Sequence, residues 1–253
     1  MILPNHRDLP KKHKVKMLTV LHGKEARYTK WMNRVPLELY VRDYKMGVIM
    51  PDGEDSFYTN MYYGNQYWTY LSEEMLRFVQ KTFPIISDTR EDNFIMGSSM
   101  GGYGALKMAF NRPDLYSAAA SLSGGFDLPN LFDLSGYHNI GNYIFGSLER
   151  MIDGNENLFN NIEKMAKKKK ILPRIYMCCG MEDFVYGGNQ KIKQVLEKNK
   201  IDFTYDEWHG VHDWKFWNRA FLEVIKWLGV TKVENISSDE PTGNRKKQVL
   251  EEV

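Results

Sequence analysis

A short glycine-rich segment constrains the fold of this chain more than any other stretch. It carries the pattern G-x-S-x-G at residues 97–101, after an apolar run at 94–96 and before a helix-like run at 105–110. We therefore expect a strand, a sharp turn and a helix, with Ser99 at the apex. Glycines on either side let strand and helix approach closely around a strained apex residue. The pattern predicts a serine that is held ready to react.

Strands and helices are expected to alternate along the rest of the chain. The apolar runs typical of strands lie at residues 17–22, 47–50, 94–96, 116–122, 174–179 and 203–208. Apolar residues at helical spacing predict further helices at 68–83, 189–199 and 214–228. This order predicts an α/β fold, with a mainly parallel sheet covered by helices on both faces.

The length of 253 residues fits one α/β domain, which we expect to occupy residues 1–230. Residues 124–170 break the alternation of strands and helices. An insert at this point is expected to lie above the carboxyl edge of the sheet, as a helical cap that shapes the substrate pocket. A helical decoration of the surface is the alternative. Residues 231–253 are charged and polar, which predicts a mobile tail.

The composition argues against several classes of partner. The net charge of +2 is too close to balance for a nucleic-acid-binding protein or an anionic membrane surface. No stretch has the length of a membrane span, and residues 1–16 lack the apolar core of a signal peptide. Cys178 and Cys179 are adjacent in an apolar run, so we expect buried thiols without a disulfide. These observations favour a cytoplasmic protein.

A reactive serine needs a base to take its proton, and the base needs a carboxylate to orient it. In α/β hydrolases the acid and then the histidine follow the serine along the chain. Glu182 and Asp183 follow the fifth expected strand, and His209 and His212 follow the sixth. His212 is favoured because it lies deeper in its loop and directly before a helix. The residues themselves leave the choice between the two acids open.

The oxyanion of a tetrahedral intermediate needs hydrogen-bond donors. The backbone N–H of Met100, directly after the serine, is expected to be one of them. The loop after the first strand begins His22-Gly23-Lys24, so the N–H of Lys24 is expected to be the other. The histidines and cysteines lack the spacing of a zinc site, and no phosphate-binding glycine loop is present, so we expect no metal and no cofactor.

Several segments are similar to one family. They lie at residues 51–58, 67–74, 97–105, 112–114, 118–124 and 210–214. Together they resemble the esterase D-like putative esterase family of α/β hydrolases, and most closely its tributyrin esterase and feruloyl esterase branch. The resemblance extends from about residue 2 to residue 229. Members of the family carry strands before the region that matches residue 2, so this chain is expected to have a shortened or exposed sheet edge.

The resemblance implies a serine carboxylesterase with Ser99 as nucleophile, Asp183 as acid and His212 as base. Its substrates would be short-chain acyl, acetyl or feruloyl esters, some of them linked to carbohydrate. The loop that holds Lys24 is poorer in glycine than in the family, which leaves the geometry of that oxyanion donor open. We also expect four residues to border the substrate: His22 in the loop after the first strand, and Tyr58, Trp68 and Trp214 in family-like stretches.

Other functions remain compatible with this sequence. An acyltransferase or an S-formylglutathione thioesterase would use the same three residues. A non-catalytic binding protein on a hydrolase scaffold is the rival from another class, although such relatives generally lose one of the three. The sequence also leaves a homo-oligomer open.

Overall fold

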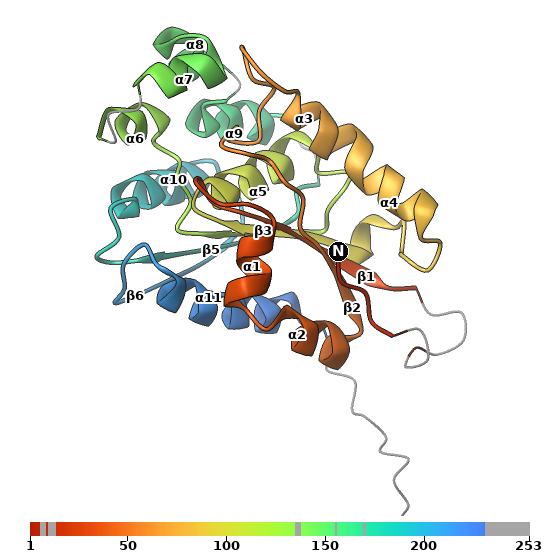
Figure 1. The fold of residues 1–253 in the computed structure, drawn as a ribbon. Coiled ribbons are helices and arrows are strands. Elements are labelled where there is room, and N and C mark those ends of the chain that lie inside the picture. Colours follow the sequence, from red (N-terminus) through yellow and green to blue (C-terminus); the bar gives the residue numbers. More distant parts are fainter. Residues whose placement is uncertain (6–8, 10–13, 135–137, 155, 169–170, 231–253) are drawn as a thin grey trace, which may run out of the picture.

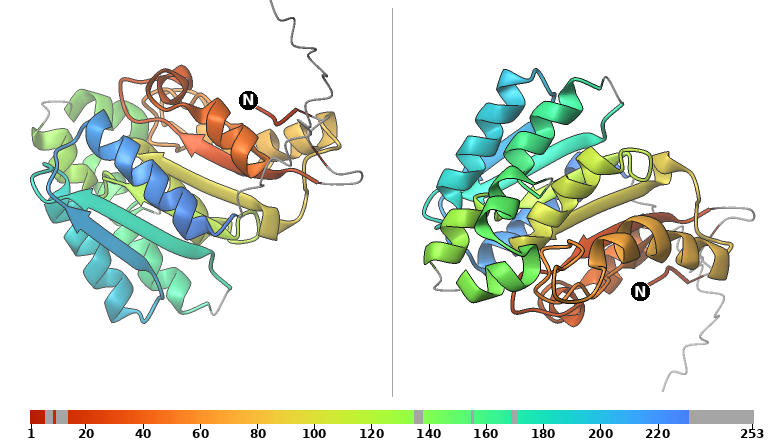
Figure 2. Two further views of the ribbon diagram at one scale, coloured as in Figure 1. Left: turned by 90° about the horizontal axis from the view of Figure 1, so that it is seen from below. Right: turned by 90° about the horizontal axis from the view of Figure 1, so that it is seen from above.

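One twisted sheet lies between two layers of helices in the computed structural model (Figures 1 and 2). The structure describes residues 1–5, 9, 14–134, 138–154, 156–168 and 171–230. The expected tail at 231–253 lies outside these residues. No helix within the described part is both long and apolar enough to cross a membrane.

The sheet has six strands in the order β2-β1-β3-β4-β5-β6, and each neighbouring pair is parallel. The strands are β1 Lys16–Leu21, β2 Met46–Ile49, β3 Asn93–Ser98, β4 Ala118–Leu122, β5 Arg174–Gly180 and β6 Thr204–Trp208. All six were expected, with similar bounds. The central strands β3 and β4 are buried along their whole length, which explains why they read as apolar or small-residue runs without alternation.

The helices differ from the expectation mainly near the N-terminus. Their bounds are α1 Thr29–Arg34, α2 Leu37–Tyr44, α3 Tyr67–Thr69, α4 Leu76–Thr82, α5 Met100–Asn111, α6 Leu128–Leu134, α7 His138–Phe145, α8 Leu148–Asp153, α9 Leu158–Ala166, α10 Tyr186–Lys198 and α11 Trp214–Leu228. The helix expected at 68–83 is present as α3, a π-helical turn at Tyr70–Met75, and α4. The short helices α1 and α2 were not expected.

Each face of the sheet has its own hydrophobic core, because successive strand residues point to opposite faces. Along β1, Met17 packs in the core on the face covered by α4, α5, α9 and α10. Leu18 packs in the core on the opposite face, which α1, α2 and α11 cover (Figure 1). Both cysteines of β5 are buried, as expected: Cys178 and Cys179 are each 0% exposed and unpaired by any disulfide.

The insert between β4 and β5 folds into the four helices α6, α7, α8 and α9. Helix α9 contacts α5 and α10 and so belongs to one of the two helical layers. Helices α6, α7 and α8 contact one another and lie together at one end of the molecule (Figure 1). Of these, α6 reaches the cavity described below.

The sheet edge formed by β2 is partly covered. Ile2 forms an antiparallel bridge with Val48, in which each backbone N–H donates to the other residue's carbonyl oxygen at 2.8 Å. An unpaired strand edge is a site for pairing with other chains, and this bridge occupies two of its groups.

Candidate active site

The turn at Ser99 has the strained geometry that the glycine pattern predicts. Ser99 has φ +56° and ψ −120° and directly precedes α5. A Cβ atom on Gly97 would lie 2.4 Å from the carbonyl carbon of Gly101, and one on Gly101 would lie 2.3 Å from the carbonyl oxygen of Leu21. Any side chain at either position would therefore push α5 away from β3 or β1. The expected strand, sharp turn and helix are confirmed.

A chain of hydrogen bonds connects Ser99 to a buried carboxylate. His212 Nε2 lies 2.9 Å from Ser99 Oγ, and His212 Nδ1 lies 2.9 Å from each carboxylate oxygen of Asp183. The side chain of Asp183 is 0% exposed, and it also accepts the backbone N–H of Val185 at 3.0 Å. Because the carboxylate accepts a hydrogen bond from the Nδ1–H of His212, the lone pair on Nε2 faces the serine hydroxyl.

The neighbouring candidates have a different role. Glu182 accepts hydrogen bonds from His209 Nδ1 at 2.6 Å and from the backbone N–H of Gly210 at 2.7 Å. The bond from His209 lowers the pKa of the Glu182 carboxyl. Both side chains are exposed, and they join the loop after β5 to the loop after β6. The structure thus brings Asp183 and His212, and neither Glu182 nor His209, to the serine.

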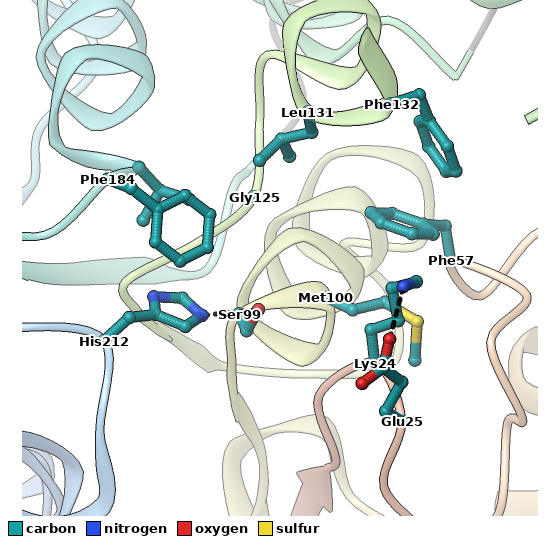
Figure 3. Close-up of a pocket in the computed structure, with 11 residues that line it drawn as sticks. Lys24, Glu25, Phe57, Ser99, Met100, Gly125, Leu131, Phe132, Phe184 and His212 are labelled. Carbon is teal, nitrogen blue, oxygen red and sulfur yellow. Dashed lines mark hydrogen bonds and ion pairs between the residues drawn. The ribbon is translucent and has the colours of Figure 1, made fainter. Parts of the chain in front are cut away.

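The two residues whose backbone N–H groups are expected to form an oxyanion site, Met100 and Lys24, lie beside Ser99. Met100 is the first residue of α5, and an N–H in the first turn has no partner within its own helix. A Cβ on Gly23 would lie 3.4 Å from Ser99 Cβ, so the next residue, Lys24, also borders the serine. Both Met100 and Lys24 line the cavity in front of it (Figure 3).

This cavity has a volume of about 290 Å³. Its lining residues are Lys24, Glu25, Phe57, Ser99, Met100, Gly125, Leu131, Phe132, Phe184, Val185 and His212. Phe57 and, from α6, Phe132 stand on the side of Lys24 and Met100 (Figure 3). Phe184 lies beside His212 on the other side, and Leu131 of α6 lies between them (Figure 3). The space at Ser99 therefore has two sides of different composition.

The four residues expected to border the substrate do not line this cavity, and this expectation needs correction. His22 is 1% exposed; its Nε2 accepts the N–H of Gly53 at 2.9 Å, and its Nδ1–H donates to the carbonyl oxygen of Gly23 at 2.8 Å. Tyr58 is also 1% exposed, and its hydroxyl donates to the carbonyl oxygen of His22 at 2.7 Å. These two side chains hold the loop that carries Lys24.

The two tryptophans are occupied by packing. The ring of Trp68 lies 4.9 Å from the ammonium group of Lys107. The ring of Trp214 makes edge contacts with Trp31 at 5.1 Å and with Trp217 at 5.2 Å. Trp217 in turn contacts the ring of His212, with 4.9 Å between the ring centroids. Trp214 therefore supports the histidine indirectly, through Trp217.

Sequence reasoning missed the aromatic residues that do line the cavity. Phe184 directly follows Asp183, and Phe57 lies in the family-like segment 51–58, so position gave a signal in both cases. Leu131 and Phe132 carried none, because their place depends on how the insert folds over the sheet.

No group of three or more histidine, cysteine, aspartate or glutamate side chains could hold a metal ion in the part of the chain that the structure describes. The chemistry of the site can be derived from Ser99, His212 and Asp183 together with backbone donors. A hydroxyl next to an imidazole that is itself bonded to a buried carboxylate is the arrangement that activates a serine for acyl transfer.

Comparisons with known proteins agree with this geometry. The family described as "Putative esterase" matches residues 1–228. An acetyl esterase of Caldicellulosiruptor saccharolyticus is 31% identical over 223 residues, which cover 85% of this chain and 83% of that protein. The substrate-bound structure of the fluorophosphonate-binding serine hydrolase FphF of Staphylococcus aureus is 31% identical, with a TM-score of 0.83 and 89% of each chain covered.

A second solved structure, the S-formylglutathione hydrolase FrmB of Staphylococcus aureus, is also 31% identical, with a TM-score of 0.79. The match covers 89% of this chain and 90% of that one. The family match spans most of the chain, and these relatives share its sheet and helices. The chain therefore belongs to the putative esterase family of α/β hydrolases, and it is a serine hydrolase that acts on carboxylic esters.

Proposed function

We propose that this esterase hydrolyses short-chain acyl esters through an acyl-enzyme on Ser99. The observation that carries the proposal is the unbroken contact from Ser99 Oγ through His212 to the buried carboxylate of Asp183. In this assignment Ser99 is the nucleophile, His212 is the general base and acid, and Asp183 orients the imidazole. The carboxylate also stabilises the imidazolium that forms when the proton moves.

The reaction then has two halves. Ser99 Oγ attacks the ester carbonyl carbon while its proton passes to His212 Nε2, and the carbonyl oxygen becomes an oxyanion. Collapse of this intermediate breaks the bond to the alcohol oxygen, which receives the proton from His212. Water then attacks the acyl carbon and gives a proton to His212; the second collapse releases the acid and returns the proton to Ser99.

The backbone N–H groups of Met100 and Lys24 are proposed to stabilise the oxyanion in both halves. Support comes from the position of both residues beside Ser99 in the cavity lining. Backbone donors fixed by the fold need no reorganisation when charge develops, and the loss of one such donor commonly costs about 10²–10³ in kcat. His22 and Tyr58 would be positioning residues for the Lys24 donor.

A short acyl group is favoured by the size and lining of the cavity. Its volume of about 290 Å³ lies at the lower limit of ligand pockets, which span roughly 300–1,000 Å³. Phe57 and Phe132 would contact an acetyl to butyryl chain on the oxyanion side of Ser99. The insert would in this way act as a cap, through α6.

The test is hydrolysis of p-nitrophenyl acetate and butyrate by wild type and by Ser99→Ala. We expect the variant to lose at least about 10³-fold in kcat, because the acyl-enzyme cannot form. Ser98→Ala is a matched control, since Ser98 is the last residue of β3 and does not line the cavity. A Ser99→Ala enzyme with wild-type activity, correctly folded by circular dichroism, would overturn the assignment.

A thioester substrate is the second candidate, because one of the similar structures is an S-formylglutathione hydrolase. The same residues would carry that reaction, with a thiol as leaving group. Turnover of S-formylglutathione well above that of acetate esters would favour it. Transfer of the acyl group to an added alcohol faster than to water would favour an acyltransferase instead.

A further inference from the structure

Phe184 is a large apolar side chain that the fold leaves in water beside the reacting atoms. It is 65% exposed, lines the cavity, and its ring centroid lies 4.5 Å from that of His212. Exposed aromatic residues that line a binding cavity often contact a ligand. The established activity and the acyl pocket described above leave this side chain without a role.

The loop that presents Phe184 is firmly held. The N–H of Met181 donates to the carbonyl oxygen of Trp208 at 3.1 Å, and the N–H of Glu182 donates to that of Gly210 at 3.2 Å. A Cβ on Gly180 would lie only 2.2 Å from the carbonyl oxygen of Gly210, so the loops after β5 and β6 are in close contact. The loop that exposes Phe184 to solvent is therefore held in place by the loop after β6.

The chemistry of ester cleavage decides what can lie against this ring. The alcohol oxygen receives its proton from His212 Nε2, so it must come within about 3 Å of that atom. The oxyanion is directed to Met100 and Lys24, and the acyl chain to the wall that contains Phe132. The alcohol portion is left with the His212 side of the cavity, where Phe184 stands (Figure 3).

We propose that Phe184 forms the binding surface for the alcohol portion of the ester, and that it selects alcohols with a flat apolar face. This inference rests on the proposed function of Ser99 and His212. An aromatic ring of the alcohol would pack on Phe184 in the transition state of acylation and leave with the alcohol. The acyl-enzyme that remains is the same for every alcohol, so the selection acts on kcat/KM and not on deacylation.

The experiment compares benzyl acetate with ethyl acetate, which share an acyl group and have alcohols of similar basicity. Wild type is expected to prefer the benzyl ester by about tenfold in kcat/KM, the size of an aromatic contact with some apolar burial. In Phe184→Ala this benzyl-to-ethyl ratio should fall about fivefold, and Phe184→Tyr should restore it. Phe78→Ala, at a phenylalanine 68% exposed on α4, is the control and should keep the wild-type ratio.

Three outcomes separate the possible roles. The proposal is overturned if the benzyl-to-ethyl ratio of kcat/KM in Phe184→Ala stays within twofold of wild type. This includes the case in which both esters are hydrolysed equally slowly, because Phe184 would then only support His212. Phe132→Ala should change the butyrate-to-acetate ratio of p-nitrophenyl esters and leave the benzyl-to-ethyl ratio intact. If Ser99→Ala stays active on these esters, the proposed function itself fails, whatever Phe184 does.

Discussion

Replacing Glu156 by alanine should destabilise the fold more than replacing its ion-pair partner Lys107 by methionine. Lys107 lies inside α5, and its side chain is only 4% exposed; its ammonium group pairs with Glu156 and donates to the carbonyl oxygen of Tyr58 at 3.2 Å. Burial lowers the pKa of Lys107, and the charge of Glu156 opposes that shift. The side chain of Glu156 is 26% exposed, and the Tyr103 hydroxyl, which donates to the backbone carbonyl oxygen of Glu156 at 2.8 Å, lies 3.2 Å from the carboxylate.

This asymmetry in exposure sets the two magnitudes. Glu156→Ala leaves a buried ammonium group without its counter-ion, with the carbonyl oxygen of Tyr58 as a neutral partner, which costs about 3–5 kcal/mol. Lys107→Met leaves a carboxylate that is still in contact with water, so we expect a loss of about 1–2 kcal/mol, mostly for the lost bond to Tyr58. At about 2–4 °C per kcal/mol for a chain of this size, Tm should fall by roughly 6–20 °C and roughly 2–8 °C respectively.

The assay is urea unfolding followed by circular dichroism, with Tm from the same signal. The double variant should be more stable than Glu156→Ala alone, because it removes the stranded charge. Glu223→Ala is the control, since its pair with Lys226 is exposed and should contribute less than about 1 kcal/mol. Equal losses in the two single variants, or losses that simply add in the double variant, would refute the reasoning.

Two further predictions concern the turn and the acid limit of stability. Gly101→Ala places a methyl group against the carbonyl oxygen of Leu21, so we expect the free energy of unfolding to fall by about 1–3 kcal/mol and fluorophosphonate labelling to be lost. Gly187→Ala is the control, because the space around Gly187 is open, and its stability should be unchanged or higher. A Gly187→Ala protein less stable than Gly101→Ala would contradict the close contact at Gly101. Burial raises the pKa of Asp92, but the Ser87 hydroxyl and Lys16 outweigh it, and the net pKa is lowered. Its stabilising effect is thus present above the ordinary aspartate pKa of about 3.9 and is lost as pH falls through the lower folded value. Asp92→Asn should lower the urea midpoint at about pH 7 and match wild type near pH 2; a gap independent of pH would be inconsistent with this.

The elements that the sequence predicted are those whose signal is local. The strands at β1, β3 and β5 are continuous apolar runs, and the turn at Ser99 is encoded by glycines that only a close approach of backbones requires. Helix α1 has six residues and would be marginal alone; it depends on Trp31, which is fully buried and donates its ring N–H to Leu21 at 3.0 Å. That contact is a tertiary one, so the periodicity of the sequence does not predict helix α1.

The candidate site also contains residues that the sequence predicts and residues that depend on tertiary structure. Order along the chain left His209 and His212 as candidates, and His212 was favoured because it lies deeper in its loop and directly before a helix. Asp183 and its neighbour Glu182 could be told apart only through the family resemblance. The structure separates them physically, because one carboxylate is buried against the histidine and the other is turned to the surface. The part of the cavity lining that α6 supplies could not be predicted from the sequence, because Phe132 lines the cavity only through the path of an insert whose helices pack on one another.

The two adjacent cysteine thiols of β5 can serve as a built-in chemical probe of local unfolding of the sheet. Burial raises the pKa of Cys178 well above the usual range, and that of Cys179 as well, so neither forms the thiolate that reacts with alkylating agents. Strand β5 leads directly into the loop that carries Asp183. A thiol reagent therefore records how often the strand that leads to Asp183 separates from its neighbours, with no label added to the protein.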